Sequence, residues 1–154
     1  MTPACAEVSG DSPMLIVDTN VISEIMRLSP SIRVMEWWSQ QQTEELFTTT
    51  VSMAEILYGV EILPRGKRRD SLRVQAELVF TQDFAGRIWP FDFEAAASFP
   101  IIAAERRAHG RPIAELDAQI ASIARSRGAT LATRNTDDFE GCGVRLVDPW
   151  LEVK

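Results

Sequence analysis

The chain has 154 residues, which is enough for one domain with a hydrophobic core but not comfortably for two. Apolar residues make up 45% of it and charged residues 25%, an ordinary globular composition, and no apolar run approaches the roughly 20 residues that a membrane-spanning helix needs. A membrane protein is therefore excluded. With two cysteines no disulfide framework is possible, so a disulfide-stapled secreted module is excluded as well and a reducing cytoplasm is favoured.

The charge balance limits how the chain could meet a nucleic acid. It has 16 Lys plus Arg against 22 Asp plus Glu, which gives a net charge of −6. An acidic chain does not attract a polyanion through its overall field, so binding to RNA or DNA would need a local basic patch, a cation, or both. The single histidine, His109, also excludes catalytic schemes that use several histidines.

Residues 1–13 are mostly small or polar, so we expect a disordered leader there and one folded domain over residues 14–154. The folded part begins with an apolar run at 15–17, whose lack of alternation is typical of a strand buried on both faces. Further strands are expected at 46–49, 87–91, 129–133 and 144–147.

Helical segments are expected between these strands. They are predicted at 21–26, around 32–38, and at 52–63, 70–82, 93–109 and 113–127, with a basic turn at 64–69. Pro100 should kink or end the helix that contains it, and Gly128 suits the end of the last helix. Strands that alternate with helices predict an α/β fold, with a parallel sheet covered on both faces.

Acidic side chains occur where these strands are expected to end. Asp18 directly follows the first strand, Glu55 begins the helix after the second, and Asp138 lies shortly after the fourth. Asp117 lies in the first turns of the helix at 113–127. Because ligands bind at the carboxyl ends of strands in open parallel sheets, these four carboxylates could converge. Converging carboxylates repel one another unless they bind a cation, and oxygen ligands without His or Cys select a hard ion such as Mg²⁺ or Mn²⁺.

Each of these residues also has a structural interpretation to weigh. Asp18 and Asp138 could simply cap short helices. Glu55 stands three residues after Ser52, which fits a capping box, and the local pattern alone favours that role. Asp117 is the least explained by structure, because it falls inside the apolar stripe of its helix, where an unpaired carboxylate is costly.

A basic cluster lies in the turn predicted at 64–69. It could contact an RNA backbone, although a solvated turn between two helices is the commoner origin of such a run. The residues concerned are Arg65, Lys67, Arg68 and Arg69.

Four sequence blocks, in this order, resemble the PIN-domain family. They are Leu15-Ile16-Val17-Asp18-Thr19-Asn20, Ser52-x-x-Glu55, Leu116-Asp117-Ala118-Gln119-Ile120-Ala121 and Ala132-Thr133-Arg134-Asn135-Thr136-x-Asp138-Phe139. The chain is most similar to the ribonuclease toxins of VapBC-type toxin–antitoxin pairs, especially the FitB-like branch. The resemblance extends from about Met14 to Trp150.

This resemblance implies a three-layer α/β/α sandwich with a central parallel sheet. It also implies a Mg²⁺- or Mn²⁺-dependent endoribonuclease that forms a homodimer and is held inactive by a cognate antitoxin. Asp18, Glu55 and Asp117 match the main acidic positions of the family. Asn135 stands where some members have Asp, so either Asn135 or Asp138 could complete the metal site. Thr133 matches a hydroxyl position that could orient a ligand or a water.

We therefore expect RNA hydrolysis by a metal-activated water, with Asp18 and Asp117 as the main metal ligands. The alternative is a module of the same fold that binds RNA or a protein without cleavage, in which the acidic residues act as caps. A metal phosphatase is disfavoured, because residue 20 is Asn rather than the second Asp of an Asp-x-Asp pair.

Overall fold

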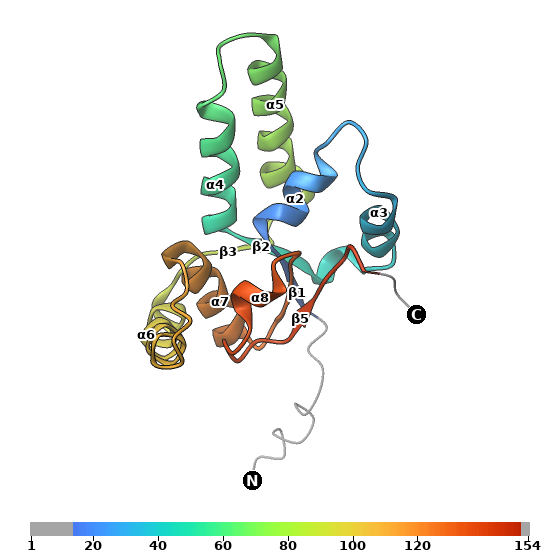
Figure 1. The fold of residues 1–154 in the computed structure, drawn as a ribbon. Helices are drawn as coiled ribbons and strands as arrows, with labels where there is room; N and C mark the ends of the chain where they lie inside the picture. Colours follow the sequence, from blue (N-terminus) through green and yellow to red (C-terminus); the bar gives the residue numbers. More distant parts are fainter. Residues whose placement is uncertain (1–13, 152–154) are drawn as a thin grey trace.

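The computed structural model describes residues 14–151, so the leader expected at 1–13 lies outside the described residues. Within this range the centre of the fold is a five-stranded sheet with the order β3-β2-β1-β4-β5 (Figure 1). All of its strand pairs are parallel, as the alternation of strands and helices predicts. The strands are β1 (Leu15–Val17), β2 (Leu46–Thr49), β3 (Ile88–Trp89), β4 (Thr130–Ala132) and β5 (Leu146–Val147).

Helices cover both faces of this sheet, which confirms the three-layer α/β/α sandwich. Helices α6 and α7 pack on one face, and α2 to α5 lie on the other, where α4 and α5 form a hairpin that projects beyond the sheet (Figure 1). The α-helices are α2 (Thr19–Ile25), α3 (Ile32–Ser39), α4 (Thr50–Glu61), α5 (Lys67–Leu78), α6 (Phe93–Ala108), α7 (Glu115–Arg127) and α8 (Thr136–Phe139). Two short helical turns, η1 (Thr43–Glu45) and η2 (Val79–Asp83), precede β2 and follow α5.

The central strands are buried on both faces, which accounts for their unbroken apolar sequences. On β1, Ile16 packs into the cluster under α6 and α7, and Val17 packs into the cluster under α2 and α3. On β4, Leu131 and Ala132 divide between the same two clusters. Period-two geometry sends neighbouring side chains to opposite faces, so both positions of each pair must be apolar.

The order of the strands reverses at the centre of the sheet. From β1 the chain runs outward to β2 and β3, then returns across α6 and α7 to place β4 on the other side of β1. The backbone N–H of Asp18 donates to the carbonyl of Ala132 at 2.9 Å, so the pairing of β1 with β4 reaches the carboxyl ends of both strands. Connections that leave in opposite directions from such a point open a crevice above it, where ligands bind in this class of fold.

The start predicted for the helix at 52–63 is wrong. Helix α4 begins at Thr50 rather than at residue 52, because the side chain of Thr49 accepts a hydrogen bond from the Ser52 N–H at 3.0 Å and caps the helix. At Pro100, where a kink or an end was expected, helix α6 does not end but continues to Ala108. Pro100 is exposed, so water can reach the carbonyl that the missing N–H leaves unpaired.

In the part of the chain that the structure describes, no helix is long and apolar enough to cross a membrane.

Gly128 ends α7 in the left-handed conformation, with φ of 66°, as its position after the helix predicts. Gly128→Ala should lower the free energy of unfolding by about 1 kcal/mol, because a Cβ is strained at this φ. Gly59→Ala is the matched control: Gly59 lies inside α4 with open space around its Cα, and alanine there should add about 0.5–1 kcal/mol of stability. Urea melts of both variants measure the effects, and a neutral Gly128→Ala would contradict the account of this helix end.

Candidate active site

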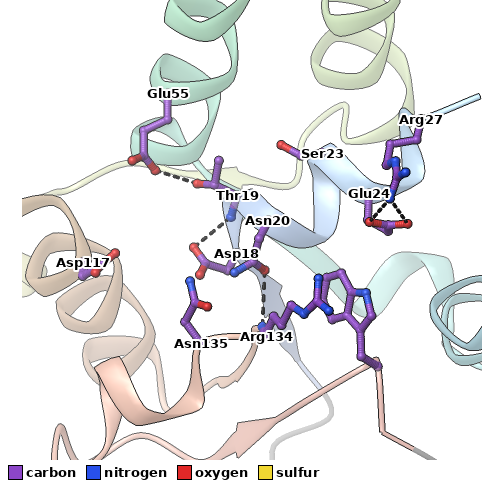
Figure 2. A pocket seen from close by; sticks show the side chains of 11 residues that line it. Asp18, Thr19, Asn20, Ser23, Glu24, Arg27, Glu55, Asp117, Arg134 and Asn135 are labelled. Atoms are coloured by element: carbon purple, nitrogen blue, oxygen red, sulfur yellow. Dashed lines mark hydrogen bonds and ion pairs between the residues drawn. The ribbon is translucent and has the colours of Figure 1, made fainter. Parts of the chain in front are cut away.

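Three of the predicted acidic residues line one cleft above the carboxyl ends of β1 and β4. The cleft has a volume of about 470 Å³, and Asp18, Glu55 and Asp117 all border it together with Asn135 (Figure 2). They come from the end of β1, from α4 and from α7. The fold therefore brings carboxylates that are distant in sequence to the point where the strand order reverses.

Asp18 lies at the centre of this group, with 4% of its surface exposed. It occupies the N-cap position of α2, and its Oδ1 accepts a hydrogen bond from the Thr19 N–H at 2.8 Å. Its Oδ2 accepts a second one from the Thr133 hydroxyl at 2.8 Å. Burial raises the pKa of Asp18, and these two hydrogen bonds offset part of that rise. The capping role is real, and it holds the carboxylate at the cleft.

Thr133 lies behind Asp18 rather than in the cleft. It is fully buried, and its hydroxyl donates to Asp18 while it accepts from Asn20 Nδ2 at 3.3 Å. Asn20 in turn accepts from the backbone N–H of Arg134 through its Oδ1, also at 3.3 Å. Asn20 was not among the predicted site residues, although its position just after β1 was a usable signal. Together these contacts tie the end of β4 to the first turn of α2 and fix Asp18 between them.

Glu55 is half-buried on the second turn of α4 and faces α2. Its Oε1 accepts a hydrogen bond from the Thr19 hydroxyl at 2.6 Å, and that hydroxyl also lies 2.8 Å from the Ser52 hydroxyl. The capping-box interpretation is wrong, because Thr49 is the N-cap and the Ser52 N–H donates to it. With the helix start moved, Glu55 has no backbone partner to cap.

Asp117 is half-buried in the first turn of α7 and lies across the cleft from Asp18 (Figure 2). Burial raises its pKa to about 6, and the negative charges of Asp18, Asp138 and Glu55 contribute to this rise. The positive charge of Arg106 opposes it in part. The N-terminus of α7 would favour a negative charge here, so burial and repulsion outweigh the helix dipole.

Asn135 and Asp138 take different positions beside this group. Asn135 borders the cleft and is the N-cap residue of α8, with its N–H donating to the Thr133 hydroxyl at 3.1 Å. Asp138 is exposed within α8, so it does not take the cap position that was the alternative for it. Its charge nevertheless contributes to raising the pKa of both Asp18 and Asp117.

The donor chemistry of this group fits a hard divalent cation. Among residues 14–151, no three Asp, Glu, His or Cys side chains stand close enough to enclose an ion as they are placed. The carboxylates nevertheless act on one another, since several negative charges contribute to the raised pKa of Asp117. A site made of carboxylate and amide oxygens with surplus negative charge suits Mg²⁺ or Mn²⁺.

The predicted basic cluster spans a loop and the first turn of a helix rather than a turn alone. Helix α5 begins at Lys67, and Arg69 is committed to an ion pair with Glu61 at 2.6 Å. Arg68 lines a groove of about 770 Å³ between α2, α4 and α5, which Glu55 also borders. Arg65 and Lys67 are exposed. The structure thus places Arg68 in a groove that Glu55 also borders, outside the lining of the acidic cleft, and leaves Arg69 bound to a neighbouring helix.

The chain is similar to a known family and to several of its members. The family model described as "PIN domain" matches residues 15–142. Plasmid stability protein StbB of Pseudomonas syringae pv. tomato is 39% identical, and the match covers 89% of this chain and 99% of StbB. VapC ribonuclease Y4jK of Sinorhizobium fredii is 35% identical over 89% of this chain and 98% of its own length. Toxin FitB of Neisseria gonorrhoeae is 37% identical over 89% of this chain and 99% of its own length.

A solved structure agrees with these relatives. The crystal structure of FitAcB from Neisseria gonorrhoeae superposes with a TM-score of 0.83 at 37% identity. The superposition covers 89% of this chain and 99% of the matched chain.

The raised pKa of Asp117 predicts that its charge destabilises the metal-free fold. An acid whose pKa rises from 3.8 to about 6 on folding binds its proton more tightly in the folded state. Its contribution to stability is therefore greatest below about pH 4 and is lost as the pH rises through about 6. Asp117→Asn should stabilise the protein in EDTA at pH 7.5 by on the order of 1 kcal/mol after solvent screening, or about 3 °C in melting temperature.

Glu115→Gln is the matched control for this measurement. Glu115 is exposed in the same first turn of α7, where its charge is favoured by the helix dipole. Thermal melts in EDTA should show no gain for this variant. If Asp117→Asn also shows no gain in melting temperature at pH 7.5, the charge of Asp117 does not destabilise the metal-free fold.

Proposed function

This chain belongs to the PIN-domain family, and we propose that it is a metal-dependent endoribonuclease, the toxin of a toxin–antitoxin pair. The observation that carries the proposal is the convergence of Asp18, Glu55 and Asp117 on one cleft at the reversal of the strand order. A ribonuclease and a toxin are among its relatives, and the matches cover nearly the full length of each. RNA is the proposed substrate and its phosphodiester bonds are the bonds broken.

Asp18 and Asp117 are proposed as the main ligands of a Mg²⁺ or Mn²⁺ ion. Glu55 would bind the ion directly or through a water, and Asn135 or Asp138 would complete the site. When bound, such an ion supplies an ionised water at neutral pH and stabilises negative charge on the phosphoryl oxygens. Thr133 holds Asp18 in position from behind, because its hydroxyl donates to the Oδ2 atom. Thr19 orients Glu55 through its hydroxyl and so fixes α4 relative to the end of β1.

The partners follow from the same charge pattern. A cleft with several carboxylates attracts a cationic side chain, so we propose that a cognate antitoxin inserts an Arg among them and displaces the ion. The likeness to the solved structure of FitAcB supports a partner protein, while the inserted Arg is suggested by the charge of the cleft alone. A homodimer and a cytoplasmic location belong to the same proposal, and the free, buried thiol of Cys142 suits a reducing compartment.

Asp117→Asn should abolish cleavage of an unstructured RNA in Mn²⁺ and leave the fold intact. The rate should fall by more than about 100-fold, since loss of a metal ligand costs at least as much as loss of a group that supports one. Gel assays with and without chelator measure this, and Glu115→Gln should cleave at the unmodified rate. Glu55→Gln should also lose most activity while its melting temperature changes little, because glutamine can still accept the Thr19 hydrogen bond. If the Asp117→Asn variant cleaves RNA at the unmodified rate, Asp117 is not a ligand of the metal.

The competing function is a module that binds RNA or protein without cleavage, and a metal titration separates the two. If the acidic cleft holds an ion, stability should rise by about 1.4 kcal/mol for each tenfold increase in Mn²⁺ above its dissociation constant. Asp117→Asn should flatten this rise, whereas Glu115→Gln should retain it. A melting temperature that ignores Mn²⁺ would favour the binding module.

A further inference from the structure

The cleft that contains the acidic side chains also has a basic wall. Arg134 follows Thr133 after β4, and its guanidinium lies over the ring of Trp150, with Cζ 4.9 Å from the ring centroid. Both side chains line the same cleft as Asp18 and Asp117. In the view of Figure 2, Arg134 lies on the opposite side of Asp18 from Asp117. The cleft therefore has an acidic end and a basic end.

Within residues 14–151, Arg134 is held in place by its backbone and by Trp150 rather than by an ion pair, although its positive charge contributes to lowering the pKa of Glu24. The backbone N–H of Arg134 donates to Asn20 Oδ1 at 3.3 Å, which fixes the residue to the first turn of α2. Trp150 is itself anchored. Its backbone N–H donates to Asp148 Oδ1 at 2.9 Å, and its side chain packs against the cluster under α2 and α3. A guanidinium stacked on an anchored ring loses little freedom when it binds a ligand.

The charge of Arg134 is available, in contrast to that of the other arginine in the cleft. Arg27 pairs with Glu24 at 3.3 Å, and Glu24 also accepts a hydrogen bond from the Ser31 N–H at 2.8 Å. Across residues 14–151, by comparison, Arg134 makes no ion pair, and it is exposed to solvent. Stacking uses the face of the guanidinium and leaves the N–H groups along its edge to bind an anion.

We propose that Arg134, supported by Trp150, binds a phosphate of the RNA strand beside the phosphate that is cleaved. The inference rests on the proposed ribonuclease function and assigns a substrate-binding role to the basic end of its cleft. A guanidinium fork matches two phosphate oxygens, and the resulting charge-assisted hydrogen bonds are strong. A chain with a net charge of −6 needs such a local cation to hold a polyanion against its acidic site.

RNA binding without cleavage tests the contact directly. Fluorescence anisotropy in EDTA, with a short unstructured fluorescein-labelled RNA, gives the binding constant as a function of salt. Arg134→Gln should reduce the slope of log K against log salt by about 0.7, the value for one phosphate contact on a single strand. Arg134→Lys should keep most of the slope but bind more weakly, because lysine lacks the fork and the stacking geometry. Arg107→Gln, at an exposed arginine in the last turn of α6 that does not line the cleft, should change neither.

Steady-state cleavage of the same RNA in Mn²⁺ provides the second measurement. Arg134→Gln should raise KM by about tenfold and leave kcat within about threefold, since a lost charged hydrogen bond to substrate weakens binding by this much. Trp150→Leu should raise KM by less, because the charge remains while its support is removed.

The outcomes separate this inference from the proposed function. An unmodified protein that cleaves RNA, with an Arg134→Gln variant unchanged in slope and KM, would overturn the role of Arg134 and leave the nuclease standing. An unmodified protein that binds but never cleaves, with the expected loss of slope, would keep the phosphate contact and reject the nuclease. Lower melting temperatures for Arg134→Gln and Trp150→Leu with unchanged RNA binding would show that the pair only anchors the C-terminal segment. Weaker binding to a co-purified antitoxin with RNA binding unchanged would show that Arg134 meets a protein carboxylate, which also contradicts the inference.

Discussion

The repulsion among carboxylates at one edge of the sheet is the constraint around which the cleft is built. Asp18, Glu55 and Asp117 come from separate elements, yet the negative charges of Asp18 and Glu55 both contribute to the raised pKa of Asp117. Proteins rarely keep such charges together without a reason, because each one must be desolvated and held against its neighbours. In this fold the backbone topology holds the carboxylates together. The strand order reverses between β1 and β4, and the reversal leaves a crevice that is bordered by the loops and helix starts that carry them.

Hydrogen bonds around the cleft oppose this repulsion and hold two of the carboxylates in fixed positions. Asp18 is held by Thr133 and the Thr19 N–H, and Glu55 is held by the Thr19 hydroxyl. Thr19 therefore links two of the acidic residues, Asp18 through its backbone N–H and Glu55 through its hydroxyl. Asp117 lies opposite and carries the raised pKa that burial and the surrounding charges produce. A divalent cation held by Asp18 and Asp117 would supply the positive charge that offsets this repulsion, and this is the physical basis of the proposed metal site.

The sequence identified site residues best where a charged side chain falls in a buried position. It was least informative where the role of a side chain depends on the residue at which a helix begins. The parallel sheet followed from apolar runs such as Leu15–Val17, and Asp117 stood out because a helical stripe offered it no partner. At Glu55 the local pattern favours a capping box, and that alternative is wrong because the pair of Thr49 with Ser52 sets where α4 begins. The contact of Asn20 with Thr133 joins residues at opposite ends of the chain, so only the folded structure reveals it. The pairing of Arg134 with Trp150 depends in the same way on the path of the chain after β5.

The position of a bound ion tests the central claim most directly. Crystals of the protein grown with Mn²⁺ would give an anomalous diffraction signal at any ordered manganese. We expect a peak within coordination distance of both Asp18 and Asp117. Glu55 should contact this ion either directly or through a water. A manganese bound only elsewhere on the molecule, with Asp18 and Glu55 still hydrogen-bonded to their present partners, would contradict the central claim.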